Sequence, residues 1–172
     1  SKILVVQDTS LRDGADMESM KGRVVKGYEL LKLVGSGGFG AVYQAHQSII
    51  EREVAIKVIL PHHANDPHFI RNFEAEAHLI ARLEHPYIVP LYDFWRNHEG
   101  AYLVMRYYPT GNLSQLVHRG GAIDIETVAR MIEQVASALD AAHSNNIIHR
   151  DIKPENILLD AHGNAYLSDF GL

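Results

Sequence analysis

Two polar clusters separated by a short apolar hairpin limit most strongly what this chain can fold into and do. The first, His149 to Asn156, carries an acid, a cation and an amide within six residues, and the second is Asp169-Phe170-Gly171. Apolar runs at 157–159 and 165–167 flank a turn rich in Asp, Gly and Asn, which predicts a small β-hairpin. Polar clusters at the two ends of one hairpin can converge on one site. Carboxylate and amide oxygens at that site would suit Mg²⁺.

These clusters resemble the catalytic loop and the metal-binding motif of protein kinases, H-R-D-x-x-x-x-N and D-F-G. The resemblance implies that Asp151 accepts the proton of a substrate hydroxyl, and that Asn156 and Asp169 hold the metal. Lys153, two residues after Asp151, is the form found in serine/threonine kinases, and we count it with Asp151 as catalytic. An H-R-D tripeptide alone would be a weak signal. The Lys, the Asn and D-F-G in order argue against a plain surface loop.

A glycine-rich stretch, Gly35 to Gly40, lies between β-prone runs at 28–34 and 41–46. Glycines allow close approach of the backbone, so their N–H groups can point at phosphate oxygens. The dinucleotide-binding fingerprint has the same G-x-G-x-x-G letters, but it requires a helix directly after the glycines. Here a strand-like run follows, so we predict a hairpin. The kinase form G-x-G-x-x-G-x-V implies nucleotide binding by Gly35, Gly37, Gly38, Gly40 and Val42.

A lysine on a strand and a glutamate on a helix are expected to pair. Lys57 lies in V-A-I-K; a strand lysine is usually a solvated edge charge, but the kinase resemblance implies contact with the α- and β-phosphates. Asp66 and Pro67 predict the start of a helix, and Glu76 lies on its apolar stripe. A carboxylate on an apolar face is costly unless it is paired. We therefore expect Lys57 and Glu76 to form a catalytic ion pair.

Runs at 88–94 and 101–107 predict two further strands. The resemblance places Met105 where it controls access behind the adenine, and 106–108 as a hinge that binds adenine through backbone groups. Kinases commonly have Glu at the position of Arg106, a departure that leaves backbone contacts intact. The remaining nucleotide-site residues implied by the resemblance are Ala55, Lys57, Met105, Arg106, Tyr108 and Leu158.

The expected fold is α+β and protein-kinase-like, with a five-stranded antiparallel N-lobe sheet, one helix against it, and the first part of a mainly helical C-lobe. We divide the chain into an N-terminal extension or linker at 1–22, an N-lobe at 23–107 and a partial C-lobe at 108–172. In the last part, 112–118 predicts a short helix. Asp124 caps a longer amphipathic helix that ends near Asn145.

Composition excludes several classes of protein. The 172 residues are 47% hydrophobic and 22% charged, which is ordinary for a globular domain. The net charge of −5, with both signs interspersed, argues against nucleic acid as a partner. The absence of cysteine fits a reducing cytosol, so we expect a cytoplasmic location. No apolar run approaches the roughly 18 residues of a membrane span, so no membrane segment is expected in this piece.

The leading expectation is a bacterial serine/threonine protein kinase that transfers a phosphoryl group from Mg²⁺-ATP to a hydroxyl of a protein substrate. The family's activation segment, A-P-E motif and later helices do not follow D-F-G here, so we expect a truncated fragment that is inactive alone. The alternative is a catalytically silent nucleotide-binding module with a regulatory or dimerisation role. Apolar positions of the long helix that lose their cover also lead us to expect self-association.

Overall fold

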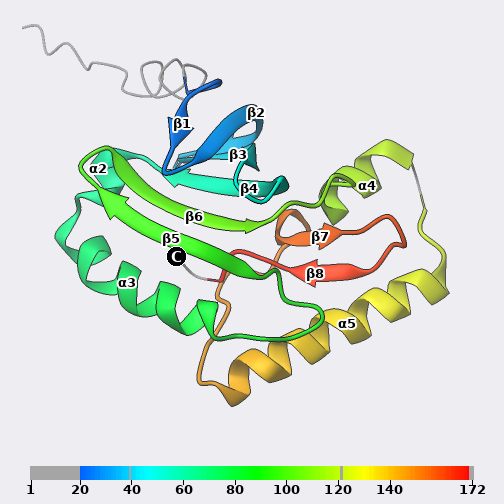
Figure 1. Ribbon diagram of the computed structural model, residues 1–172. Coiled ribbons are helices and arrows are strands. Elements are labelled where there is room, and N and C mark those ends of the chain that lie inside the picture. Colours follow the sequence, from blue (N-terminus) through cyan, green and yellow to red (C-terminus); the bar gives the residue numbers. More distant parts are fainter. Residues whose placement is uncertain (1–19, 39, 121, 171–172) are drawn as a thin grey trace, which may run out of the picture.

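The computed structural model describes residues 20–38, 40–120 and 122–170. An antiparallel sheet of six strands, in the order β1-β2-β3-β4-β6-β5, forms the first part of the described chain (Figure 1). Its strands are β1 (Val24–Val25), β2 (Tyr28–Gly37), β3 (Gly40–Gln47), β4 (Arg52–Ile59), β5 (Leu91–Asn97) and β6 (Gly100–Arg106).

The prediction of five strands was one short. The additional strand, β1, is a two-residue edge strand whose Val24 pairs with Glu29 and whose Val25 pairs with Tyr28. Two residues are too few to show a periodic pattern, so no pattern of apolar residues indicated β1. The expected extension at 1–22 lies outside the described residues except for residues 20–22.

The strand expected at 88–94 begins three residues later, as β5 at Leu91. Residues 87–89 pair elsewhere: Leu167 donates its N–H to Tyr87 O at 2.9 Å, and Val89 donates to Leu167 O at 2.9 Å. Arg106 N–H then donates to Pro90 O at 3.3 Å. The segment before β5 is therefore attached to the later part of the chain, and residue 90 lies beside the end of β6.

Both faces of the sheet are buried at β4, each by a separate hydrophobic cluster. Val54, Ile56 and Val58 lie in a cluster on one face, which also contains Tyr43 and Tyr102. Ile59, on the other face, lies in a second cluster with residues of α2, α3 and β6: Ala64, Phe73, Ala77, Ala101 and Leu103. A strand buried on both faces reads as a nearly continuous apolar run, as β4 does, and Lys57 is the exception in it.

Two helices follow β4. The single turn α2 (Pro61–Ala64) was not predicted, whereas α3 (Pro67–Ala81) begins where it was expected. The Asp66 carboxylate accepts from His68 N at 2.8 Å and from Phe69 N at 3.0 Å, which satisfies two of the unpaired N–H groups at the helix start. Figure 1 shows α3 running along the sheet beside β5.

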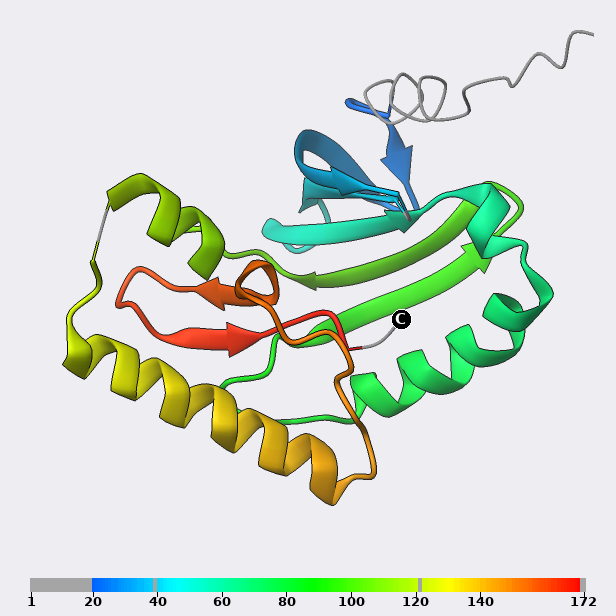
Figure 2. The ribbon, with the colours of Figure 1, turned by 180° about the vertical axis from the view of Figure 1, so that it is seen from behind.

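The last part of the described chain contains α4 (Leu113–Gly120), α5 (Ile125–Ser144) and the antiparallel hairpin of β7 (Ile157–Leu159) and β8 (Ala165–Leu167). The predicted hairpin and the predicted cap are confirmed, with the Asp124 carboxylate accepting from Thr127 N at 2.8 Å. Figure 2 shows α5 running beneath the hairpin, and Gln134 joins the two by accepting from Ala165 N at 2.8 Å. No helix within the described residues is long and apolar enough to cross a membrane.

Candidate active site

Lys57 lies on the sheet face that α3 covers, between Ala55 and Ile59, as its alternation with apolar neighbours predicted. Its side chain is 19% exposed, and its Nζ lies 2.7 Å from Oδ1 of Asp169, which is 112 positions later in the chain. A hydrogen bond between two ionised groups at this distance is among the stronger kinds. The V-A-I-K lysine and the D-F-G carboxylate therefore meet in one site.

The backbone of Asp169 is in the left-handed region, at φ 57°. That conformation costs a non-glycine residue on the order of 1 kcal/mol, so its neighbours must hold it. Phe170 is 4% exposed and packs on the ring of His149, with ring centroids 4.7 Å apart. His149, 1% exposed, is hydrogen-bonded through Nε2 to Ser168 O at 2.7 Å. Residues on both sides of Asp169 are thus fixed against the catalytic loop.

Asp151 is surrounded by donors. Lys153 Nζ lies 2.7 Å from its Oδ2, and Asn156 Nδ2 donates to its backbone O at 2.8 Å and to its Oδ2 at 3.0 Å. The hydrogen bond from Lys153 has the largest effect and lowers the pKa of Asp151; desolvation, the next largest effect, opposes it, and the hydrogen bond from Asn156 lowers the pKa further. The same contact raises the pKa of Lys153. At neutral pH the pair is ionised, with an exposed carboxylate oriented by its neighbours.

Ser168 joins the two polar clusters. Its N–H and its Oγ both donate to Asn156 O, at 2.9 and 3.0 Å. Both residues are buried, Asn156 at 6% and Ser168 at 4% exposure. The predicted convergence of the hairpin's two ends is therefore confirmed, and it depends on Ser168, which no motif singled out.

The glycines of the β2–β3 hairpin have unequal surroundings. A Cβ added at Gly35, Gly37 or Gly38 would meet nothing within 4 Å, whereas one added at Gly40 would lie 1.9 Å from Val58 O. None of these four glycines has a positive φ. The expected hairpin is confirmed, but the strict need for glycine arises at Gly40, where the backbone of β4 approaches too closely for a side chain.

The segment expected to be the hinge follows β6. Tyr108 is buried, and its backbone O accepts from Gly111 N at 3.2 Å, while its N–H has no hydrogen-bond partner within the described part of the chain. Arg106 is exposed at the end of β6. Leu158 of β7 is brought beneath this segment because Leu159 N–H donates to Gly111 O at 2.9 Å. Within the described residues, the Tyr108 N–H is therefore a backbone donor that remains available to a ligand.

A small cavity of about 30 Å³ lies behind Met105. Met105 pairs across the sheet with Ala55, and the cavity wall also includes Leu103, Asp169 and Phe170. Met105 therefore borders this cavity, and control of access to the space behind the nucleotide site by its side chain stays a prediction.

The predicted pairing of Lys57 with Glu76 is not made in this structure. Lys57 meets Asp169 instead, and no ion pair of Glu76 occurs among the described residues. Glu76 is half-buried and lines a different cavity of about 110 Å³, together with Ile80, Ile148, Arg150 and Phe170. Glu76 does lie on the inner side of α3, as its place in the apolar stripe indicated, but it faces the catalytic loop rather than β4.

Comparison with known proteins gives a family. A family model described as "protein kinase domain" matches residues 28–172. This chain belongs to the protein kinase family. It is 41% identical over 150 residues to the serine/threonine-protein kinase PrkC of Bacillus subtilis, and 39% identical over 155 residues to the serine/threonine-protein kinase PknE of Mycobacterium tuberculosis. PknH of Mycobacterium tuberculosis is 37% identical over 155 residues.

These alignments cover 87% of this kinase chain for PrkC and 90% for PknE and PknH. They cover only 23%, 27% and 25% of the relatives' own lengths, so the chain spans about a quarter of each relative it matches. The family therefore accounts for nearly the whole of this chain.

Within the described residues of this kinase domain, no group of three or more His, Cys, Asp or Glu side chains could hold a metal ion. The candidate metal ligands remain Asn156 and Asp169.

Sequence reasoning missed one contact of the glycine-rich hairpin, made by His63 of α2, whose Nε2 lies 2.9 Å from Gly38 O. No spacing rule would have found this contact because α2 itself was not predicted.

Proposed function

We propose that this chain is the nucleotide-binding and catalytic-loop part of a serine/threonine protein kinase. The whole protein would transfer the γ-phosphoryl group of Mg²⁺-ATP to a serine or threonine hydroxyl of a protein substrate. The observation that carries the proposal is the 2.7 Å contact of Lys57 Nζ with Asp169 Oδ1, next to the Asp151–Asn156 hydrogen bonds. A cytoplasmic location fits the proposal, since ATP is its substrate.

The side chains present suit Mg²⁺. Asn156 uses its amide nitrogen on Asp151, which leaves its amide oxygen as a ligand. Asp169 uses Oδ1 on Lys57, and its Oδ2 has no hydrogen-bond partner within the described residues. Oxygen donors of this kind are those that Mg²⁺ selects. When bound, the ion would neutralise charge on the β- and γ-phosphates.

Each remaining residue has a role in this proposal. Lys57 binds the α- and β-phosphates, and Asp151, ionised and held by two donors, orients the attacking hydroxyl and accepts its proton. Lys153 places a positive charge beside the transferred group, where negative charge develops. Glu76 would pair with Lys57 only after α3 shifts toward β4.

The nucleotide would lie between the sheet and the β7–β8 hairpin. In this arrangement Tyr108 N–H and the backbone O of Arg106 bind the adenine edge. The glycine-rich hairpin covers the phosphates with backbone N–H groups from Gly35, Gly37, Gly38 and Gly40. Apolar contacts with the adenine come from above and below, from Val42, Ala55, Met105 and Leu158.

The metal role is tested by calorimetry of ATP binding, with Mg²⁺ and with a chelator, on wild type, Asp169→Ala and Asp140→Ala. Asp140 is an exposed residue of α5 outside the site, so its variant controls for the loss of one carboxylate. We expect Mg²⁺ to strengthen binding in wild type and Asp140→Ala but not in Asp169→Ala. Equal enhancement in all three proteins would exclude Asp169 as a ligand.

Phosphoryl transfer is tested in a protein that contains a complete kinase domain. Asp151→Asn there should lower turnover by about 10²–10⁴-fold while ATP binding persists, if Asp151 is the positioned base. Unchanged turnover would exclude Asp151 as the positioned base, whereas a wild type without turnover would favour the silent nucleotide-binding module.

Self-association is a second part of the proposal. An open apolar groove of about 350 Å³ lies between α4, α5 and β7, and Ile132 in its wall is 63% exposed. Other wall residues are Leu113, Val117, Val128, Val135 and Leu139. Exposed apolar surface of this size favours burial against another molecule, and a second copy of the chain presents the same surface.

A further inference from the structure

The tip of the glycine-rich hairpin has little packing of its own. Side chains would meet nothing within 4 Å at Gly35, Gly37 or Gly38, so no neighbour is in van der Waals contact at these Cβ positions. Glycine also loses more conformational freedom than any other residue when it is ordered. A contact from outside the hairpin therefore has a large effect on where the tip lies.

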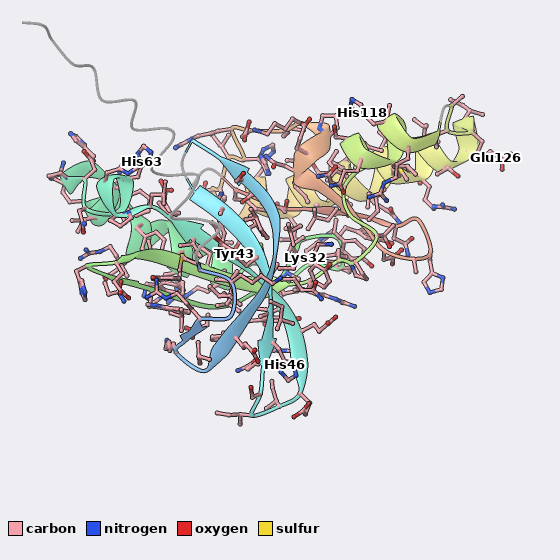
Figure 3. All side chains as sticks on the ribbon, turned by 90° about the horizontal axis from the view of Figure 1, so that it is seen from above. Lys32, Tyr43, His46, His63, His118 and Glu126 are labelled. Carbon is pink, nitrogen blue, oxygen red and sulfur yellow. The ribbon has the colours of Figure 1, made fainter. Side chains whose placement is uncertain are left out.

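Such a contact comes from α2. The Nε2 atom of His63 lies 2.9 Å from Gly38 O. Because a carbonyl oxygen can only accept, Nε2 carries the hydrogen and donates it. Figure 3 shows His63 on α2, at the side of the molecule toward which the β2–β3 hairpin extends.

The turn that carries His63 is well anchored. Ala64 is fully buried in the cluster that also contains Ile59 and Ala101, and its N–H donates to Leu60 O at 2.8 Å. Two residues after Ala64, Asp66 caps α3. His63 thus connects the hairpin tip to the rigid start of the helix that carries Glu76.

We propose that His63 is a positioning residue for nucleotide binding. By donating to Gly38 O, it holds the glycine-rich tip in place before the nucleotide arrives. This inference rests on the proposed function, since the ligand whose phosphates the tip covers is ATP. Ordering a glycine-rich segment in advance lowers the entropy lost on binding, so the hydrogen bond improves affinity without touching the nucleotide.

The inference is tested with His63→Ala, His63→Gln and His68→Ala. The Gln side chain can place an N–H donor near the position of Nε2. His68 is an exposed histidine at the start of α3, and its side chain makes no hydrogen bond with the described residues of the hairpin. Two quantities are measured: hydrogen exchange of backbone amides in peptides covering residues 35–42 without nucleotide, and the dissociation constant of Mg²⁺-ATP by calorimetry.

We expect His63→Ala to accelerate exchange in the hairpin and to weaken ATP binding by about three- to tenfold, the range of one lost hydrogen bond. His63→Gln should recover most of both effects, and His68→Ala should change neither. In a complete kinase domain, His63→Ala should raise the KM for ATP and leave kcat unchanged. Loss of a residue that only stabilised α2 would not change KM without changing kcat.

Unchanged hairpin exchange and unchanged affinity in His63→Ala would overturn the inference, as would tighter binding. Failure of His63→Gln to recover any of the lost affinity would also count against it. If wild type binds no nucleotide, the proposed function fails. Hydrogen exchange in the absence of nucleotide would still decide whether His63 holds the tip.

Discussion

Gly40 offers the sharpest test of the hairpin geometry. Replacing it by Ala would place a Cβ 1.9 Å from Val58 O and 2.9 Å from Val58 C, so β3 or β4 must move. Overpacking of this kind costs about 1–3 kcal/mol, and backbone atoms yield less readily than a flexible side chain. For a domain of this size the loss corresponds to a fall in Tm of roughly 2–12 °C.

The matched variant is Gly35→Ala, because a Cβ there meets nothing within 4 Å. Its unfolded state loses conformational freedom, so the change should be neutral or stabilising by up to about 1 kcal/mol. Thermal and urea unfolding of the two variants, without nucleotide, measures the difference directly. Equal Tm values would refute the close approach of β3 and β4 at Gly40.

Three further predictions follow from the structure. Hydrogen bonds from Asn164, Tyr166 and His162 outweigh partial burial, which opposes them, and lower the pKa of Asp160 to about 2. Because the folded-state pKa is depressed, Asp160 stabilises the fold above its ordinary pKa of 3.8, and this contribution is lost as the pH falls toward 2. The difference in free energy of unfolding between wild type and Asp160→Asn should therefore fall by about 1–2 kcal/mol between pH 3.8 and 2, a value reduced for solvent screening. A difference that stays constant with pH would contradict the role of these hydrogen bonds. Light scattering over a concentration series should show self-association that Ile132→Glu abolishes; a monomeric wild type at high concentration would exclude the groove as an interface. Ser168→Ala removes one of the two hydrogen bonds to Asn156 O, so it should lower stability by about 1 kcal/mol and weaken Mg²⁺-dependent ATP binding, and an unchanged Mg²⁺ effect would show that Asn156 needs no such support.

The sequence predicted those parts of the site that local patterns encode. Asp66 and Asp124 identified two helix starts because a cap satisfies N–H groups within a few residues of itself. The hairpin at 157–167 brought the ends of two motifs together because its turn and its apolar runs are short. The contact of Lys57 with Asp169 was not predicted, since no local rule relates residues 112 positions apart.

Other features depend on tertiary contacts that leave no local trace. Glu76 lies on the predicted face of α3, but the cation with which it pairs depends on how the helix is placed against the sheet. In this structure Lys57 pairs with Asp169 and not with Glu76. The role of Gly40 depends on the distance between two backbones, and that of Ser168 on where two distant segments cross. The strand β1 was not predicted because two residues are too few to show the alternation of apolar and polar side chains that indicates a strand.

The attachment of residues 87–89 to β8, described above, also defines where the two parts of the domain can turn relative to each other. Since Leu167 fixes this segment to the later part of the chain and Arg106 N–H holds Pro90, the axis of any such rotation passes near residues 90 and 106. The C-terminal end of α3 at Ala81 is close to this segment in the chain, whereas its start at Pro67 follows α2. A rotation would therefore displace the start of α3, together with His63 and the glycine-rich tip, farther than the end of the helix. The displacement in such a rotation would grow with distance from residues 90 and 106, and it would be large at Gly38.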